Sequence, residues 1–266
     1  MKKILILNLL LLLAICCKKE TYSSRLLNCA VEYLSFTDEY RFLVTSFHYP
    51  PNDPYKNKFT YSYQSDKIAK VVGGFQQIPC GSNLCDLIFS TAVHDSIIYR
   101  SDSVFVFTYP GVTYFLNDNP GSPSIYIYNS NGRFQKLYRR DGFEVNYEYS
   151  VNQITEKDKN GSIIRNLYFE NNNLIRIEKL DYYGQETVQH KREILCQDYD
   201  NYPNPYMNTH YIVGAYIRAF SENNCKTIIF NEYNLVDGNL ALTSAQTISI
   251  PFDYNKDHYP LFGDYK

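Results

Sequence analysis

Tryptophan is absent from the 266 residues, and methionine occurs only twice. The chain also lacks an excess of charge of one sign, because 26 Lys and Arg stand against 28 Asp and Glu, for a net charge of −2. A nucleic-acid partner requires a basic surface that neutralises phosphates, so this balance argues against one. A hydrophobic share of 44% is enough to build a core, which excludes a chain that is disordered throughout.

Signatures of catalysis are missing as well. The sequence has neither a Gly-x-Ser-x-Gly elbow nor a His-Glu-x-x-His metal motif. His94 and Asp95 are adjacent, which on a strand directs their side chains to opposite faces and prevents them from working as a pair. Asp198 and Asp200 lack the glycine and the distal glutamate of a calcium loop. We therefore predict a protein that is not an enzyme, with no catalytic residue, no metal and no cofactor.

A long apolar run occurs at the amino terminus. Ile4 to Ile15 is broken only by Asn8 and follows Lys2 and Lys3. A membrane-spanning helix needs about 20 apolar residues. A shorter run behind positive charges is typical of a secretory signal. We predict a signal peptide over residues 1–16.

The segment Leu13-Ala14-Ile15-Cys16-Cys17 resembles the lipobox of bacterial lipoproteins. The resemblance implies that a cysteine sulfur carries diacylglycerol, with palmitate-type chains, and that the signal is cut before this cysteine. Cys17 is favoured, with Ala14 three residues before it; Cys16, with Leu13 in that place, is the alternative. Acyl chains contribute about 0.8 kcal/mol per buried CH₂ and would anchor the protein to a membrane. Residues 17–27 then form a polar tether to the outer membrane, on its periplasmic or its surface-exposed side.

Five cysteines follow the lipobox, and a cell envelope permits disulfides. Cys80 and Cys85 enclose Gly81-Ser-Asn-Leu84, whose Gly, Ser and Asn favour a turn, so these two cysteines could form a disulfide or remain free thiols. A zinc site is disfavoured because no second Cys/His pair lies at ligand spacing. Cys196 and Cys225 could also pair, and the sequence leaves this open.

Tyrosine is abundant, with 27 residues, and its distribution predicts strands. Aromatic and polar residues alternate, a polar turn follows, and a second alternating run comes after it. Tyr128, Tyr149 and Phe169 occupy equivalent places in successive copies, separated by 21 and 20 residues. Period-two alternation is typical of antiparallel strands with one buried face. The four copies that show this pattern lie at residues 59–71, 125–138, 145–157 and 167–179.

These copies predict the fold class: an all-β antiparallel meander of repeated hairpins, twisted or curled, with one short helix or irregular connector. Asn-Gly and Asp-Gly pairs supply the turns. The helix is expected over residues 206–220, where the apolar stripe is partial. We expect a single β-rich domain over residues 28–266, with the hairpin repeats mainly in 124–180.

The copies resemble the tyrosine-rich YD repeats of RHS-type proteins, although the Tyr-Asp dipeptide is missing from them. With the lipobox and two further segments, Tyr199-Asp-Asn-Tyr-Pro-Asn-Pro205 and Ser221-Glu-Asn-Asn-Cys-Lys-Thr227, the chain resembles a group of uncharacterised Bacteroidetes-type envelope lipoproteins. The resemblance implies envelope attachment and carries no activity with it.

The tyrosines suggest what the sheet does. Tyr126, Tyr128, Tyr147 and Tyr149 share a strand parity, which predicts that they pack in the core or across strands. Tyrosines that remain exposed could contact a glycan or a protein. We therefore predict a lipid-anchored, non-catalytic binding or structural module that presents a Tyr-rich sheet. The alternative is an envelope hydrolase acting on a glycan or other polymer, which would need a cleft with two carboxylates or a histidine beside a nucleophile.

Overall fold

The computed structural model describes residues 29–30, 58–80, 83–109, 122–182, 187–212, 215–249 and 253–261. Within these ranges, fourteen strands form one antiparallel sheet in which each strand pairs with its neighbours in the sequence, from β1 to β14. Two further strands, β15 and β16, form a separate small hairpin. The prediction of an all-β antiparallel meander is confirmed.

The strands of the first half are β1 (Cys29–Ala30), β2 (Lys58–Gln64), β3 (Lys67–Cys80), β4 (Asn83–Tyr99), β5 (Ser103–Tyr109), β6 (Ser124–Tyr128), β7 (Phe134–Tyr138) and β8 (Glu144–Tyr149). Those of the second half are β9 (Gln153–Asp158), β10 (Ile163–Glu170), β11 (Asn173–Asp181), β12 (His190–Pro203), β13 (Asn223–Val236), β14 (Asn239–Ser249), β15 (Asp253–Tyr254) and β16 (Pro260–Leu261). One 3₁₀ helix, η1 (Arg218–Phe220), precedes β13.

All four predicted hairpin copies form, as β2–β3, β6–β7, β8–β9 and β10–β11. Their tight turns depend on residues that tolerate positive φ. Asn171 and Asn172, between β10 and β11, have φ of 49° and 61°, and Gly132, between β6 and β7, has φ of 73°. Asparagine and glycine adopt this conformation at low cost, so the local sequence sets where the chain reverses.

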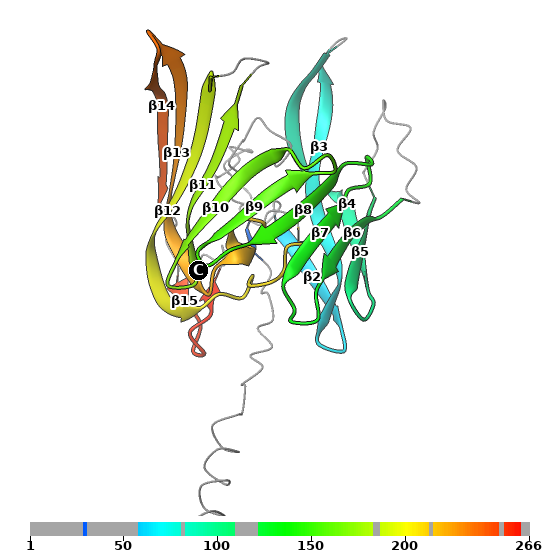
Figure 1. Cartoon of the computed structure of the whole chain (residues 1–266). Coiled ribbons are helices and arrows are strands. Elements are labelled where there is room, and N and C mark those ends of the chain that lie inside the picture. The colour runs from blue at the N-terminus through cyan, green and yellow to red at the C-terminus, as the bar shows by residue number, and fades with distance from the viewer. Residues whose placement is uncertain are drawn as a thin grey trace, which may run out of the picture.

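The sheet is strongly twisted, and the strand direction changes from β3 and β4 through β8 to β12–β14 (Figure 1). Its inner face carries two hydrophobic clusters. The first cluster combines β7–β14 residues such as Phe134, Leu167 and Ile228 with Tyr216 and Ile217. The second cluster consists of Phe59, Ile68, Val71, Ile97, Val104, Val106, Tyr206, Ile212 and Ala215. Both clusters therefore include residues of the segment between β12 and β13, which we call the connector (residues 204–222).

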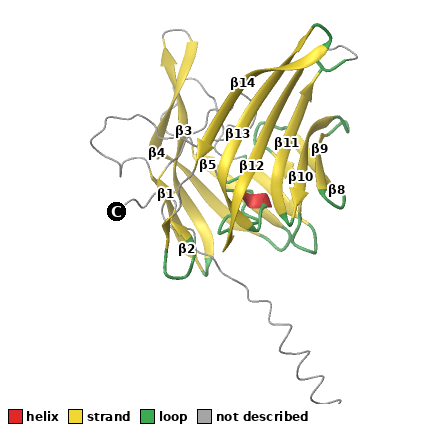
Figure 2. Cartoon of the chain, turned by 90° about the vertical axis from the view of Figure 1, so that its left-hand side faces the viewer, coloured by secondary structure: helices red, strands yellow, loops and turns green. Residues whose placement is uncertain are grey.

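Of the two alternatives expected for this segment, one short helix or an irregular connector, the structure has the irregular connector, and the helix expected over residues 206–220 is limited to η1. The described part of the connector is a series of turns closed by hydrogen bonds three residues apart, such as the amide of Thr209 to the carbonyl of Tyr206 at 3.0 Å. Asn208 has φ of 63°, which interrupts a right-handed helix. The buried side chains lie all along the connector rather than in one stripe, because it contacts both clusters. Figure 2 shows η1 against the sheet near β10–β12.

The expected packing of the tyrosines is confirmed. Tyr147 is buried within the first cluster, and Tyr126 and Tyr128 are half-buried against both clusters. Tyr149 is more exposed, yet its hydroxyl donates a hydrogen bond to the carbonyl of Phe134. Same-parity aromatic residues therefore build the inner face.

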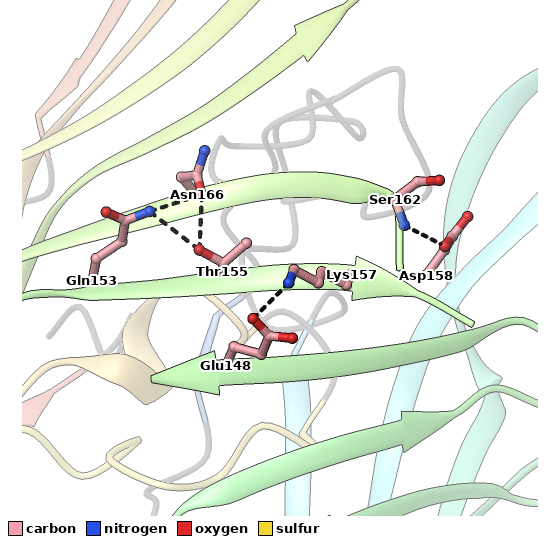
Figure 3. Close-up of polar contacts among 7 residues, drawn as sticks. All are labelled: Glu148, Gln153, Thr155, Lys157, Asp158, Ser162 and Asn166. Atoms are coloured by element: carbon pink, nitrogen blue, oxygen red, sulfur yellow. Dashed lines mark hydrogen bonds and ion pairs between the residues drawn. The ribbon is translucent and has the colours of Figure 1, made fainter. Parts of the chain in front are cut away.

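Polar ladders occupy the outer face of the same strands. On β8 and β9, Lys157 forms an ion pair with Glu148 at 2.6 Å, and on β9 and β10 Gln153, Thr155 and Asn166 form a hydrogen-bonded group (Figure 3). Cross-strand pairs of this kind contribute modestly and fix the register. The two faces of the repeats thus differ as the alternation predicted.

Candidate functional site

The predicted lipidation residues Cys17 and Cys16 lie outside the described residues, so their modification stays a prediction. Cys80 and Cys85 lie at the tip of the β3–β4 hairpin, where the backbone of Cys80 pairs with Asn83. Their side chains are outside the described part of the structure. The Cys80–Cys85 disulfide also stays a prediction.

Cys196 and Cys225 are free thiols, both buried, on the neighbouring strands β12 and β13. The two side chains are hydrogen-bonded to one another, and this contact together with burial raises the pKa of Cys196 well above its usual value. The Cys225 thiol also donates to the carbonyl oxygen of Thr227 at 3.0 Å. The two thiols pack in the first cluster as small apolar groups.

The acidic and histidine candidates fulfil structural roles. The Asp200 carboxylate accepts hydrogen bonds from the amide of Asn224 at 3.0 Å and from the hydroxyl of Tyr254 at 2.5 Å. It therefore fixes the β15–β16 hairpin against β12. His94 and Asp95 do point to opposite faces: Asp95 is buried, whereas His94 stacks on Tyr109 with ring centroids 4.6 Å apart.

The structure contains a pocket that sequence reasoning did not find. It lies where the connector meets the ends of the repeat strands, and its volume is about 230 Å³. The lining combines five aromatic rings with amide, charged and small side chains: Arg133, Phe134, Tyr149, Ser150, Gln153, Ile154, Phe169, Asn172, Met207, Asn208, His210, Ala219, Phe220 and Glu222.

Hairpin turns form the sheet side of this pocket. Ser150 lies in the β8–β9 turn, and its hydroxyl donates to the carbonyl of Gln153 at 3.2 Å. Asn172, in the β10–β11 turn, accepts a backbone hydrogen bond from Glu222 at 3.3 Å. The repeat of about 20 residues brings these turns to the same edge of the sheet, because each copy is one hairpin. A pocket lining therefore follows from the spacing of the turns.

Tyr149 and Arg133 form one wall. The Arg133 guanidinium lies over the Tyr149 ring, 5.5 Å from its centroid. Burial raises the pKa of Tyr149 to about 12, although the nearby Arg133 charge acts in the opposite direction. The phenol therefore stays neutral at physiological pH, and the wall offers an aromatic face beside a cation.

His210 forms part of the opposite wall and comes from the connector. Its ring stacks on Phe134 with centroids 4.5 Å apart and meets Phe220 edge-on at the same distance. This role could not be predicted from the sequence, because His210 lies far along the chain from Phe134 on β7. Asn208 and Phe220, which also line the pocket from the connector, were predicted only as parts of a helix.

Metal ligands and membrane-spanning helices are both missing from the described residues. No group of three or more His, Cys, Asp or Glu side chains in these ranges is arranged to hold a metal ion. In the same ranges, every helix is too short or too polar to cross a bilayer.

Comparison with known proteins adds a similarity to a solved structure and no argument about this chain. No protein-family model matches the chain, and no curated protein is significantly similar to it. Among solved structures, the chain is similar to a porin-like protein from Bacteroides uniformis ATCC 8492, with 12% sequence identity and a TM-score of 0.36. The alignment covers 71% of this chain and 87% of that one. The fold class, an all-β antiparallel meander with a pocket at the ends of the repeat strands, is therefore assigned from the strand pairing and the pocket of this chain itself.

Proposed function

We propose that this chain is a lipid-anchored protein of the bacterial cell envelope whose twisted sheet is a non-catalytic binding module. The observation that carries the binding role is the pocket between the connector and the repeat hairpins. Ligand sites in proteins are concave, rich in aromatic side chains and supplied with a few polar groups. The pocket has all three properties, and the β-sheet holds its turns in place.

The lining favours binding over hydrolysis. A hydrolase of the envelope, the alternative function, needs two carboxylates or a histidine next to a nucleophile. Glu222 supplies the one carboxylate among the pocket residues. The hydroxyl of Ser150 is hydrogen-bonded to the carbonyl of Gln153 rather than to His210.

A pocket-filling substitution tests the binding role. The full chain, in detergent, is applied to a glycan array and a peptide library. We expect Ser150→Trp, which fills the pocket from the β8–β9 turn, to abolish binding found for the unsubstituted chain. Val151→Trp is the matched control, because Val151 neighbours Ser150 in the turn but is 97% exposed and is not part of the lining.

Two results contradict the binding role. Equal loss with Ser150→Trp and Val151→Trp would place the contact elsewhere. Turnover of an envelope glycan that Ser150→Trp abolishes would favour the hydrolase.

The lipid anchor has a separate test. We expect the chain, made in a bacterium fed a clickable palmitate analogue, to carry the label. Cys17→Ala should remove the label if this cysteine is the acceptor, whereas Cys16→Ala should remove it in the alternative. Protease shaving of intact cells then distinguishes a surface-exposed protein from a periplasmic one. Label that persists when both cysteines are replaced would exclude the predicted anchor.

A further inference from the structure

The sheet ends in a long strand whose outer side is open. β14 comes last in the strand order, so within the described ranges it pairs with β13 and with no strand on its other side. It forms the edge of the sheet beside β13 (Figure 1). Every residue of β14 except Ile248 is exposed. The open side of such a strand presents backbone N–H and C=O groups that can pair with another chain.

β14 also lacks the features that prevent this pairing in most proteins. Natural edge strands are short, or carry lysine, other charges or proline. The 11 residues of β14 include no charged side chain, no proline and no glycine. At the other end of the described sheet, β1 is only two residues long. Of the two terminal strands, β14 is therefore the one that is long enough to add a further strand.

A β-bulge divides β14 into a tip and a regular run. The register with β13 shifts between Glu232 and Tyr233, which leaves Thr243 without an opposite residue. The Thr243 hydroxyl donates to the carbonyl of Glu232 at 3.1 Å and fixes the bulge. Because a bulge twists its strand locally, regular pairing with a further strand is expected over Ser244–Ser249. Ile248 packs in the first cluster and holds this run in place.

The absence of charge indicates which chain fits this edge. Like charges that lie directly opposite one another on neighbouring strands destabilise a sheet, so a charged edge repels a second copy of itself. The run Ser244–Ser249 places only uncharged side chains opposite its own copy. Two copies related by a two-fold axis would both use this edge, so that the pairing ends at a dimer instead of continuing into a fibre.

We propose that β14 is a dimerisation edge, at which the runs Ser244–Ser249 of two copies of this chain pair antiparallel about a two-fold axis. The two sheets then continue into one another. This inference goes beyond the proposed binding role and is independent of it, because no residue of β14 lines the pocket.

The test measures the association of the full chain in density-matched detergent by sedimentation equilibrium over a dilution series. We expect a monomer–dimer equilibrium. Ala245→Lys/Thr247→Lys adds positive charge to two exposed positions that face the same side of β14. Antiparallel pairing brings these positions of the two copies together, so the dissociation constant should rise about tenfold or more. The melting temperature of the variant monomer should be unchanged, because both side chains are exposed.

A matched control and a rescue separate this edge from a general effect of charge. Gln135→Lys/Gln197→Lys adds the same charge at exposed positions of β7 and β12, which have neighbouring strands on both sides, and should leave the dimer intact. Ala245→Glu/Thr247→Glu should weaken the dimer as the lysine variant does. A mixture of the glutamate and lysine variants should associate again, because opposite charges then face one another.

Hydrogen exchange provides a measurement that needs no substitution. The amides of Ser244–Ser249 should exchange more slowly at high than at low protein concentration, and equal rates would overturn the proposal. A chain that is monomeric throughout the dilution series would also overturn it. Equal effects of the edge and control lysines, or a mixture that stays monomeric, would place the contact elsewhere. Oligomers that grow beyond the dimer would show that β14 pairs with a different edge, which contradicts the two-fold dimer.

Discussion

The two halves of the inner face pack against the same connector but bury their carboxylates differently. In the second half, Glu156 on β9 is fully buried and pairs with Arg165 on β10 at 2.9 Å. In the first half, Asp95 on β4 is buried and forms no ion pair with the described residues; burial raises its pKa to about 6, against smaller opposing effects of Thr108, Arg140 and His94. A buried carboxylate thus either acquires a buried partner or tends to hold its proton.

This difference indicates how each half depends on its surroundings. The Arg165 guanidinium lies 5.8 Å from the centroid of the Tyr216 ring, so the ion pair also meets the connector. Asp95 lies opposite Thr108 in the β4–β5 pair, and its side-chain hydrogen bond with Thr108 opposes the effect of burial on its pKa. The second half should therefore be sensitive to substitution of either charge, and the first half to pH.

The largest expected effect is that of breaking the ion pair. Arg165→Met leaves Glu156 buried without its partner, which should cost about 3–5 kcal/mol of unfolding free energy. Urea unfolding followed by circular dichroism measures it. The double variant Glu156→Leu/Arg165→Met should recover most of the loss, because apolar side chains of similar size can replace a buried pair. A double variant as unstable as the single one would show that the pair itself is required.

The connector offers the next largest effect. The Asn204 amide donates to the carbonyls of Arg218 at 2.6 Å and Ser221 at 2.8 Å, and its oxygen accepts from the Tyr206 amide at 2.9 Å. Asn204→Ala leaves these three backbone groups without this partner, and we expect a loss of about 3 kcal/mol. Asn131→Ala, in an exposed hairpin turn, is the control and should change stability by less than about 0.5 kcal/mol. Equal effects would mean that the connector does not depend on Asn204.

The raised pKa of Asp95 predicts that the free energy of unfolding depends on pH. Burial raises its pKa in the folded state to about 6, above the usual value of 3.8, so the folded state binds the proton more tightly than the unfolded chain. Stability should be greatest below about pH 4 as far as this group is concerned, and should fall by about 2–3 kcal/mol as the pH rises to 6 and above. Asp95→Asn should remove this fall and be more stable than the unsubstituted chain at pH 7. An unchanged pH profile in the variant would contradict the assignment.

The same two regions explain what the sequence could and could not predict. The hairpins were predictable because alternation and turn residues act locally: Val145 and Tyr147 face inward, and Gly132 takes positive φ at the turn. The connector was not, because its conformation follows from contacts with both clusters rather than from its own periodicity. The pocket was missed for the same reason, since His210 reaches Phe134 and Phe220 only in the folded chain.

The smallest effect concerns one turn of the repeats. Gly142 has φ of 84°, and a Cβ added there would meet no atom within 4 Å, so only backbone strain opposes a side chain. Gly142→Ala should cost about 1–2 kcal/mol. Gly142→Asn should cost less, because asparagine tolerates the left-handed region. Urea unfolding measures both costs. Equal costs for alanine and asparagine would show that side-chain contacts, rather than backbone conformation, decide the turn. The local sequence would then determine less of the fold of the repeats than its pattern indicates.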